Sequence, residues 1–258
     1  MSYETILFSV ADGVATITLN RPEVMNGLNA RMRREIVQAV TEAPERARVL
    51  VLTGAGRGFC SGQDLADAGP LEALDLGRTL REEYEPMLRA IYDCPIPTIA
   101  AVNGPAAGAG ANLALAADVV IAARSASFIQ AFARIGLIPD AGGTYWLPRQ
   151  VGFARAMGAA LFADKISAEQ AADWGMIWEA VADEAFLATV AARAAQLAAG
   201  PGLAYRLIKR ALRASYARDL DGQLALEAEL QGEAGASRDF REGVAAFLEK
   251  RAPRFEGS

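Results

Sequence analysis

Histidine is absent from this chain of 258 residues. Its absence excludes Ser-His-Asp and Cys-His nucleophilic catalysis, histidine general-base chemistry and nearly all zinc enzymes. Cysteine is scarce: Cys60 and Cys94 form no CxxC motif, so we expect neither a disulfide framework nor a zinc site, and both thiols should be reduced and buried. Any acid–base catalysis must therefore use Asp, Glu, Tyr, Lys or Cys.

The chain also lacks a net positive charge and any long hydrophobic run. Its formal charge of -5 argues against a nucleic-acid-binding surface. The apolar runs are too short to span a membrane, and no basic segment leads into an apolar stretch near Met1, so we expect a cytoplasmic protein. Neither a cluster of metal ligands nor a dinucleotide fingerprint occurs, so we expect no metal or redox cofactor.

The hydrophobic pattern predicts an α/β fold with largely parallel strands. Helices alternate with strands as far as about residue 145, and nearly everything beyond is helical except a short strand at 177–181. The predicted strands are 5–10, 14–19, 48–54, 97–102, 118–123 and 127–130. The first predicted helix begins after Asn29, and the others are 74–92, 152–162, 167–174, 184–197, 203–217, 220–235 and 239–251.

Two loops rich in glycine follow predicted strands, at residues 54–65 and 103–113. Neither matches a dinucleotide fingerprint or a phosphate-binding P-loop. The density of Gly and Ala in the second loop allows its backbone to approach another helix or a ligand closely. It also leaves the N–H groups in the first turn of the following helix available.

Asp140 lies between the apolar run Leu137-Ile138-Pro139 and the turn Ala141-Gly142-Gly143. A carboxylate at the edge of an apolar cavity has a raised pKa that suits proton transfer. The same pattern is also typical of a turn or a helix N-cap. The absence of histidine favours Asp140 as the acid–base group, although these residues alone leave both interpretations open.

Four motifs occur in an order that resembles the crotonase, or enoyl-CoA hydratase/isomerase, superfamily along essentially the whole chain. They are Leu19-Asn20-Arg21-Pro22 with Met25-Asn26-Gly27-Leu28, Ser61-Gly62-Gln63-Asp64-Leu65, Val102-Asn103-Gly104 before Gly108-Ala109-Gly110, and Ala141-Gly142-Gly143-Thr144. Segments 109–115, 125–132, 139–140 and 174–178 resemble in particular the 2-(1,2-epoxy-1,2-dihydrophenyl)acetyl-CoA isomerases of phenylacetate breakdown.

This resemblance implies a crotonase-like spiral of ββα repeats, with residues 1–195 as the core that carries the active site. Residues 196–258 would form a C-terminal helical region that covers coenzyme A and mediates assembly as a homotrimer or a dimer of trimers. The substrate would be an acyl-CoA thioester, so that coenzyme A is part of the substrate and no separate cofactor is implied. By motif position, the backbone N–H groups of Gln63 and Ala109 would hold the thioester oxygen and stabilise an enolate.

The resemblance also bears on which reaction follows. Hydratases of this superfamily use two glutamates around one water, and the matching positions here are Asn112 and Phe132. An isomerase needs a single base, which Asp140 would supply, while Asn112 either orients Asp140 or the substrate or packs between helices. We therefore expect an isomerase that converts ring-1,2-epoxyphenylacetyl-CoA to the oxepin-CoA. The alternatives are a 3,2-enoyl-CoA isomerase or an enoyl-CoA hydratase of fatty-acid β-oxidation, and a non-catalytic binding protein.

Further substrate contacts follow from the same resemblance. Gly62, Asp64 and Gly110 belong to the two loops. Candidates for an aromatic-sized pocket are Phe128, Phe132, Ile138 and Trp146. Core packing is the alternative for all four, and we favour it for Phe128 and Ile138. Arg21 would lie near the pantetheine or phosphates, and Phe247 and Lys250 would reach the adenine of a neighbouring subunit. A solvated surface position is the alternative for the charged residues.

Overall fold

Six strands form a central sheet in the order β1-β2-β3-β4-β6-β9. The computed structural model describes residues 3–66 and 74–257. Strands β1 and β2 form the predicted antiparallel hairpin, and all other neighbours in this sheet are parallel. Strands β3 and β4 are continuously apolar because both of their faces are covered. The bounds are β1 (Ile6–Ala11), β2 (Val14–Leu19), β3 (Val49–Gly54), β4 (Thr98–Val102), β6 (Val119–Ala123) and β9 (Glu179–Val181).

A second sheet contains β5 (Pro105–Ala107), β7 (Ser127–Ile129) and β8 (Ile166–Ser167). The chain passes from β4 directly into β5 and then into α4 (Ala109–Leu115), and it passes from β6 into β7 and a 3-10 turn at Ala131–Ile135. Each turn of the chain therefore adds one strand to each sheet and then a helical segment. This arrangement confirms the expected spiral of ββα repeats.

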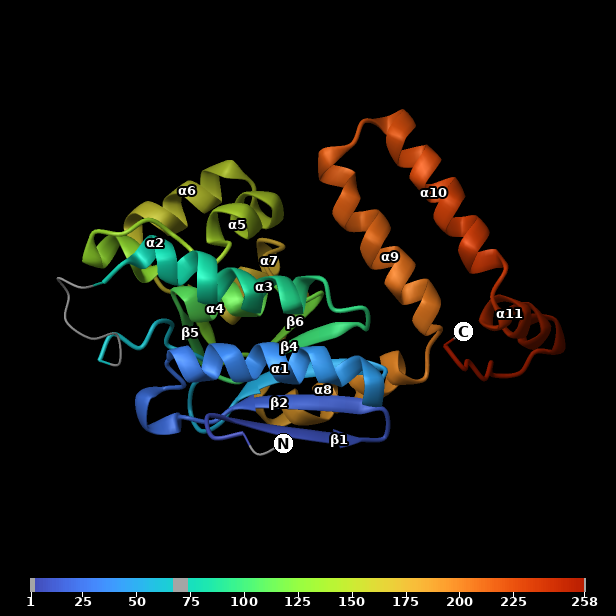
Figure 1. The fold of residues 1–258 in the computed structure, drawn as a ribbon, viewed down its shortest axis with the longest axis horizontal. Coiled ribbons are helices and arrows are strands. Elements are labelled where there is room, and N and C mark those ends of the chain that lie inside the picture. Colours follow the sequence, from blue (N-terminus) through green and yellow to red (C-terminus); the bar gives the residue numbers. More distant parts are fainter. Residues whose placement is uncertain (1–2, 67–73, 258) are drawn as a thin grey trace.

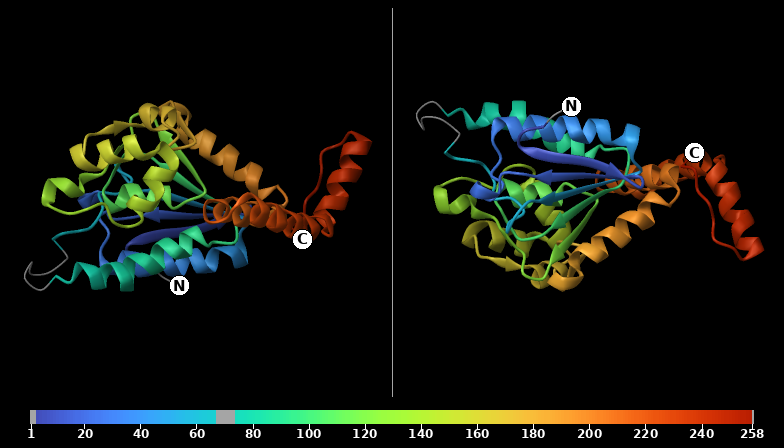
Figure 2. Two further views of the ribbon diagram at one scale, coloured as in Figure 1. Left: turned by 90° about the horizontal axis from the view of Figure 1, so that it is seen from above. Right: turned by 90° about the horizontal axis from the view of Figure 1, so that it is seen from below.

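Helices cover both faces of the six-stranded sheet (Figures 1 and 2). Helix α1 (Ala30–Arg46) packs against β1, β2 and β3, and it also contacts α3 (Glu85–Tyr92). Helix α8 (Asp183–Ala198) packs against β2, β3, β6 and β9. Asn29 caps α1 as predicted, since its side chain accepts a hydrogen bond from the Met32 N–H at 2.8 Å. The remaining helices of this part are α5 (Gly143–Val151), α6 (Phe153–Phe162) and α7 (Ala168–Asp173).

Three C-terminal helices extend from one end of the molecule (Figure 1): α9 (Gly202–Ala214), α10 (Leu220–Gly235) and α11 (Arg238–Glu249). Helices α9 and α10 share a small apolar cluster of their own, Leu207, Leu226 and Leu230, which is separate from the main core. Lys209 and Arg213 tie α9 to the main core through ion pairs with Asp118 at 2.7 and 2.6 Å. The predicted boundary at residue 195 falls inside α8, and the division into two regions stays a prediction.

The structure corrects the predicted helices at two places. The helix predicted over 74–92 is divided into α2 (Leu76–Thr79), a π-helical turn at Leu80–Tyr84, and α3. Helix α5 was not predicted because it begins at a glycine and contains Pro148, and both residues disfavour helix.

Burial of individual residues tests further predictions. Phe128 is buried as expected, whereas Ile138 is 77% exposed and its core interpretation is wrong. Ile138 lies in the irregular segment before α5, next to Pro139 and Asp140, which are both partly buried. Cys60 and Cys94 are both free and buried, as predicted. Among the described residues, no helix has the length and apolar character needed to cross a membrane.

Candidate active site

The two glycine-rich loops lie side by side. Cys60 and Ala106 form an isolated parallel bridge, and the Ala107 N–H donates to the Cys60 carbonyl at 2.9 Å. Glycine is required where the loops touch: a Cβ on Gly110 would lie 2.4 Å from the Cys60 carbonyl oxygen, and one on Gly62 would lie 2.8 Å from that of Ala107. Gly62 also has a φ of 92°, which other residues rarely adopt.

The close packing of the loops leaves two backbone donors without acceptors. Leu28 forms a parallel bridge with Gln63 of the first loop. The Leu28 N–H donates to the Gly62 carbonyl, and the Leu28 carbonyl accepts from the Asp64 N–H. The N–H of Gln63, which lies between these two bonds, has no partner among the described residues. Ala109 is the first residue of α4, whose N-cap supplies no side-chain bond, and its N–H has no intrahelical acceptor. Two free donors from adjacent loops can together bind one oxygen atom.

Both donor residues line a cavity of 320 Å³ that also contains Asp140. The wall is largely apolar, and Asp140 is the only carboxylate that the described residues contribute to it. Gly62 and Phe132, both predicted to bind substrate, lie in the same wall. The residues that line it are Ser61, Gly62, Gln63, Leu65, Leu76, Thr79, Leu80, Tyr84, Gly108, Ala109, Ala131, Phe132, Arg134, Ile135, Leu137 and Asp140.

Asp140 presents an unpaired carboxylate to this cavity. Its Oδ1 is buried and has no hydrogen-bond partner in the described part of the chain, and burial raises the pKa of the carboxyl group from 3.8 to about 6. Its backbone carbonyl accepts from the Gly143 N–H at 2.8 Å, which is a turn interaction. The side chain, however, does not cap α5, because the N-cap is Gly142 and no side chain bonds to it. The residue is thus in a turn, while its carboxylate is free for chemistry.

A second cavity of 570 Å³ meets the first at Asp140. Leu80 and Tyr84 belong to both walls, and Ile138 contributes only to this second wall. Its wall includes Tyr92, Tyr145 and Trp146, which pack against one another, with the centres of the Tyr92 and Trp146 rings 5.3 Å apart; we call this cavity the aromatic chamber. Asp140 therefore lies between the two backbone donors and an aromatic chamber.

Asn112 holds the backbone of Asp140 rather than lining a cavity. It is fully buried, and its Nδ2 donates to the Asp140 carbonyl at 2.7 Å. Its Oδ1 accepts from Gln130 Nε2 at 2.9 Å, so the orientation of the amide is fixed from both sides. The amide bonds to the backbone of Asp140 and not to its carboxylate, so orientation of Asp140 or the substrate and packing between helices both stay predictions. Gln130 was not identified from the sequence, where nothing distinguishes it from other strand-end residues.

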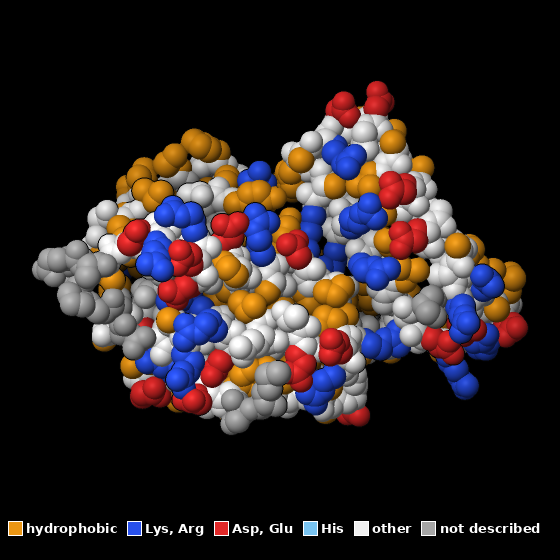
Figure 3. All heavy atoms as spheres, in the orientation of Figure 1, with side chains coloured by type: hydrophobic (Ala, Val, Ile, Leu, Met, Phe, Trp, Pro, Cys, Tyr) orange, Lys and Arg blue, Asp and Glu red, His pale blue; other side chains and the backbone are white. Residues whose placement is uncertain are grey.

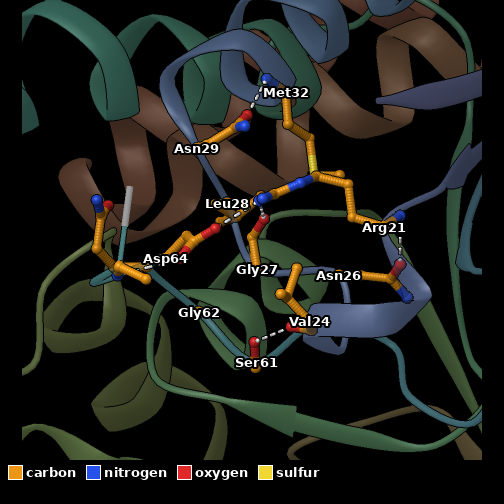
Figure 4. Close-up of polar contacts among 12 residues, drawn as sticks. Arg21, Val24, Asn26, Gly27, Leu28, Asn29, Met32, Ser61, Gly62 and Asp64 are labelled. Carbon is orange, nitrogen blue, oxygen red and sulfur yellow. Dashed lines mark hydrogen bonds and ion pairs between the residues drawn. The ribbon is translucent and has the colours of Figure 1, made fainter. Parts of the chain in front are cut away.

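Arg21 and Asp64 form an ion pair with each other at 2.7 Å, and neither lines the cavity. Arg21 also donates to the Gly27 carbonyl at 2.7 Å, and its N–H donates to the buried Asn26 side chain (Figure 4). These contacts hold the segment before α1 against the first loop. Substrate contacts by Arg21 and Asp64 stay predictions, as does any such contact by Gly110, which serves the close packing of the loops.

Phe247 and Lys250 lie far from both cavities within one chain. They are in and directly after α11, at the end of the molecule opposite α2 and α4 (Figure 1). Phe247 is 83% exposed. Contact of these residues with a bound substrate would require a second subunit, as the resemblance implies, and stays a prediction.

The sequence matches the enoyl-CoA hydratase/isomerase family over residues 9–258. The chain belongs to this family. This family member is 65% identical to "Probable enoyl-CoA hydratase" of Rhodobacter capsulatus, and the alignment covers 100% of both chains. It is 51% identical to 1,2-epoxyphenylacetyl-CoA isomerase of Escherichia coli K12, with 98% of this chain and 99% of the relative aligned. The crystal structure of enoyl-CoA hydratase from Bacillus anthracis superposes with a TM-score of 0.92 at 32% identity and covers 99% of this chain and 100% of that one.

This family member contains further residues at the site that the sequence analysis did not single out. Arg33 and Tyr84 are 3% exposed and lie behind Gln63. Arg33 is one of the basic cluster 31–34, yet it precedes Ile36, Val37 and Val40 by three, four and seven positions. That helical spacing places Arg33 on the buried face of α1 and is the pattern by which it could have been found.

Proposed function

We propose that this family member is an acyl-CoA isomerase in which Asp140 transfers a proton between two carbons of the acyl group. The observation that carries the proposal is the position of Asp140, which is the only carboxylate among the described residues of the cavity that also contains both free backbone donors. The nearby Glu85 belongs only to the second cavity and is ion-paired with Arg89 at 2.9 Å. One carboxylate suffices for an isomerisation, whereas the family's hydratases use two.

The chemistry follows from the geometry of these groups. The N–H groups of Gln63 and Ala109 would bind the thioester oxygen, which carries negative charge once a proton leaves the adjacent carbon chain. Because the wall is apolar, such donors act strongly, and loss of one typically costs about 10²–10³ in kcat. Asp140 would accept the proton as a carboxylate and return it at another carbon. No atom is gained or lost, so the net reaction consumes no water, and the absence of a cofactor stays a prediction.

For the substrate we propose the ring-1,2-epoxide of phenylacetyl-CoA, which would be converted to the oxepin-CoA in phenylacetate catabolism. The aromatic chamber beside Asp140 has room for a ring, and the 51% identical relative is named for this activity. The second candidate is a reaction of an enoyl-CoA: either its hydration, which the name of the 65% identical relative favours, or its 3,2-isomerisation.

An assay of the purified protein separates these reactions. We expect conversion of 3-hexenoyl-CoA to 2-hexenoyl-CoA and turnover of the epoxide generated in situ, with no hydration of 2-hexenoyl-CoA. Fast hydration of the 2-enoyl thioester, or isomerisation of 3-hexenoyl-CoA without turnover of the epoxide, would reject the proposal in favour of the second candidate. Asp140→Asn provides the inactive reference, and Asp173→Asn, which changes an exposed carboxylate on α7, is the matched control.

Assembly through the C-terminal helices is part of the proposal. Large apolar side chains are exposed on α9 to α11, among them Leu212, Leu220, Phe240, Phe247 and Leu248. Figure 3 shows hydrophobic side chains along these helices and over α6. A homotrimer, or a dimer of trimers, would cover them and would bring α11 of one chain to the cavity of another. Light scattering coupled to size-exclusion chromatography tests this assembly, and a monomer at micromolar concentration would contradict it.

A further inference from the structure

A buried polar cluster lies behind the first glycine-rich loop and consists of Arg33 of α1, Gln63 of the loop, and Glu83 and Tyr84 of the π-helical turn. Arg33 is 3% exposed, so its charge must be satisfied within the protein. Its Nε and Nη2 donate to Glu83 Oε2 at 3.0 and 2.6 Å. The cluster thus joins a helix, a loop and a turn that are distant in the sequence.

Arg33 also holds both partners of the bridge that leaves the Gln63 N–H free. Its Nη1 donates at 2.8 Å to the Leu28 carbonyl, which is the acceptor for the Asp64 N–H. The same nitrogen donates at 2.8 Å to Oε1 of the Gln63 side chain. Arg33 therefore fixes the backbone opposite Gln63 and the side chain of Gln63 together.

Tyr84 supplies a second donor to the same atom. Its hydroxyl donates to Gln63 Oε1, and the Arg33 guanidinium lies 4.7 Å from the centre of its ring. Burial raises the pKa of Tyr84 above its ordinary value, so the hydroxyl stays protonated and remains a donor. Tyr84 also lines both cavities. One side chain thus contacts the substrate space and the loop that would bind the thioester.

We propose that Arg33 and Tyr84 are positioning residues that act through the Gln63 side chain to keep the Gln63 N–H directed at the thioester oxygen. A free loop can rotate this peptide and turn its N–H away. Two donors on Gln63 Oε1 oppose that rotation, since the amide group would have to leave both of them. The inference rests on the proposed function, because it assumes that a thioester oxygen binds at this N–H.

Two substitutions and their combination test it. Gln63→Met keeps the backbone N–H and the length of the side chain but removes the acceptor, and Tyr84→Phe removes one donor. We expect each to lower kcat by about tenfold to a hundredfold with a smaller change in KM, because misplacement of a reacting group mainly affects the chemical step. If Tyr84 acts through Gln63, the double variant loses no more than Gln63→Met alone. Tyr216→Phe, at an exposed tyrosine, is the control.

Binding of 4-(dimethylamino)cinnamoyl-CoA gives a readout that does not depend on turnover. Donors at the thioester oxygen polarise this chromophore, so its absorption should shift to the red in the wild type and less in Gln63→Met and Tyr84→Phe. If the wild type causes no shift, the oxyanion site of the proposed function is refuted and this inference with it. Two results would overturn only the inference. In the first, the wild type shifts the absorption and both folded variants give the same shift with unchanged kcat. In the second, the reductions in kcat of the two single variants multiply in the double variant. Circular dichroism establishes folding. If Gln63→Met does not fold, a normal red shift and normal kcat in Tyr84→Phe still overturn the inference.

Discussion

Replacement of Asp140 by Asn separates the chemistry of the carboxylate from its shape. The amide keeps the size of the side chain but cannot accept a proton, so turnover should fall by at least about 10²-fold, in line with the usual contribution of a general acid–base group. Binding of the CoA thioester should change little, because the backbone donors of Gln63 and Ala109 are unaffected.

The same substitution should make the protein more stable at high pH. Burial raises the pKa of Asp140 from 3.8 to about 6, so the folded state holds the proton more tightly than the unfolded state. The favourable contribution of Asp140 is thus complete below pH 4 and is lost as the pH rises through 6. A shift of this size corresponds to about 3 kcal/mol, and solvent screening of the partly exposed group reduces it to about 1–2 kcal/mol. Asp140→Asn avoids that loss.

Thermal unfolding at pH 8 and pH 4, together with steady-state kinetics, measures both effects. At pH 8 the Tm of Asp140→Asn should exceed that of the wild type by about 2–4 °C for each kcal/mol, and at pH 4 the difference should vanish. Asp173→Asn, at an exposed site, should show neither effect. A variant with normal turnover would refute the catalytic role, and a lower Tm at pH 8 would refute the argument from burial.

Three further predictions concern the surroundings of this carboxylate. For the wild type, kcat/KM should rise about tenfold per pH unit up to a plateau above about pH 6, because Asp140 must be ionised to accept a proton; a flat profile from pH 4.5 to 8 would contradict this. Asn112→Leu should lower kcat by about tenfold to a hundredfold and stability by about 1–3 kcal/mol, since the Asp140 carbonyl loses a buried donor; kinetics and urea unfolding measure both, and an unchanged kcat would show that Asn112 only packs. Gly110→Ala should cost about 1–3 kcal/mol because its Cβ would collide with the Cys60 carbonyl, whereas the control Gly232→Ala, in open space on a helix, should stabilise the protein in the same unfolding assay; equal midpoints would contradict the collision.

Local patterns predicted most elements because each depends on neighbouring residues. The hairpin follows from alternating strands around Asp12-Gly13, and α1 follows from the cap at Asn29 and the apolar positions after it. Prediction failed where the local pattern opposes the final structure. Helix α5 contains Pro148, and the side chains that it buries in the core, Leu147 and Val151, are contacts that the local sequence does not reveal.

The candidate site divides in the same way. Asp140 became a candidate because it follows an apolar run in a chain without histidine, and the resemblance to the family favoured an acid–base role over a turn or N-cap. The burial of Ile138 was predicted wrongly, since its apolar character says nothing about which side of the chain faces the second cavity. Arg33 and Gln130 were not identified, because their partners Gln63 and Asn112 lie far away in the sequence.

The sequence by itself determined the alternation of strands and helices, the two glycine-rich loops, the exclusion of histidine chemistry and the resemblance to the family. These properties are local or compositional. Only the tertiary structure decided that the loops lie together, that the N–H groups of Gln63 and Ala109 have no acceptor among the described residues, and that Asp140 lines one cavity with both donors and a second cavity with aromatic side chains. The physical reason is that desolvation and the lack of a hydrogen-bond partner depend on atoms from segments that are brought together only by the folding of the ββα spiral.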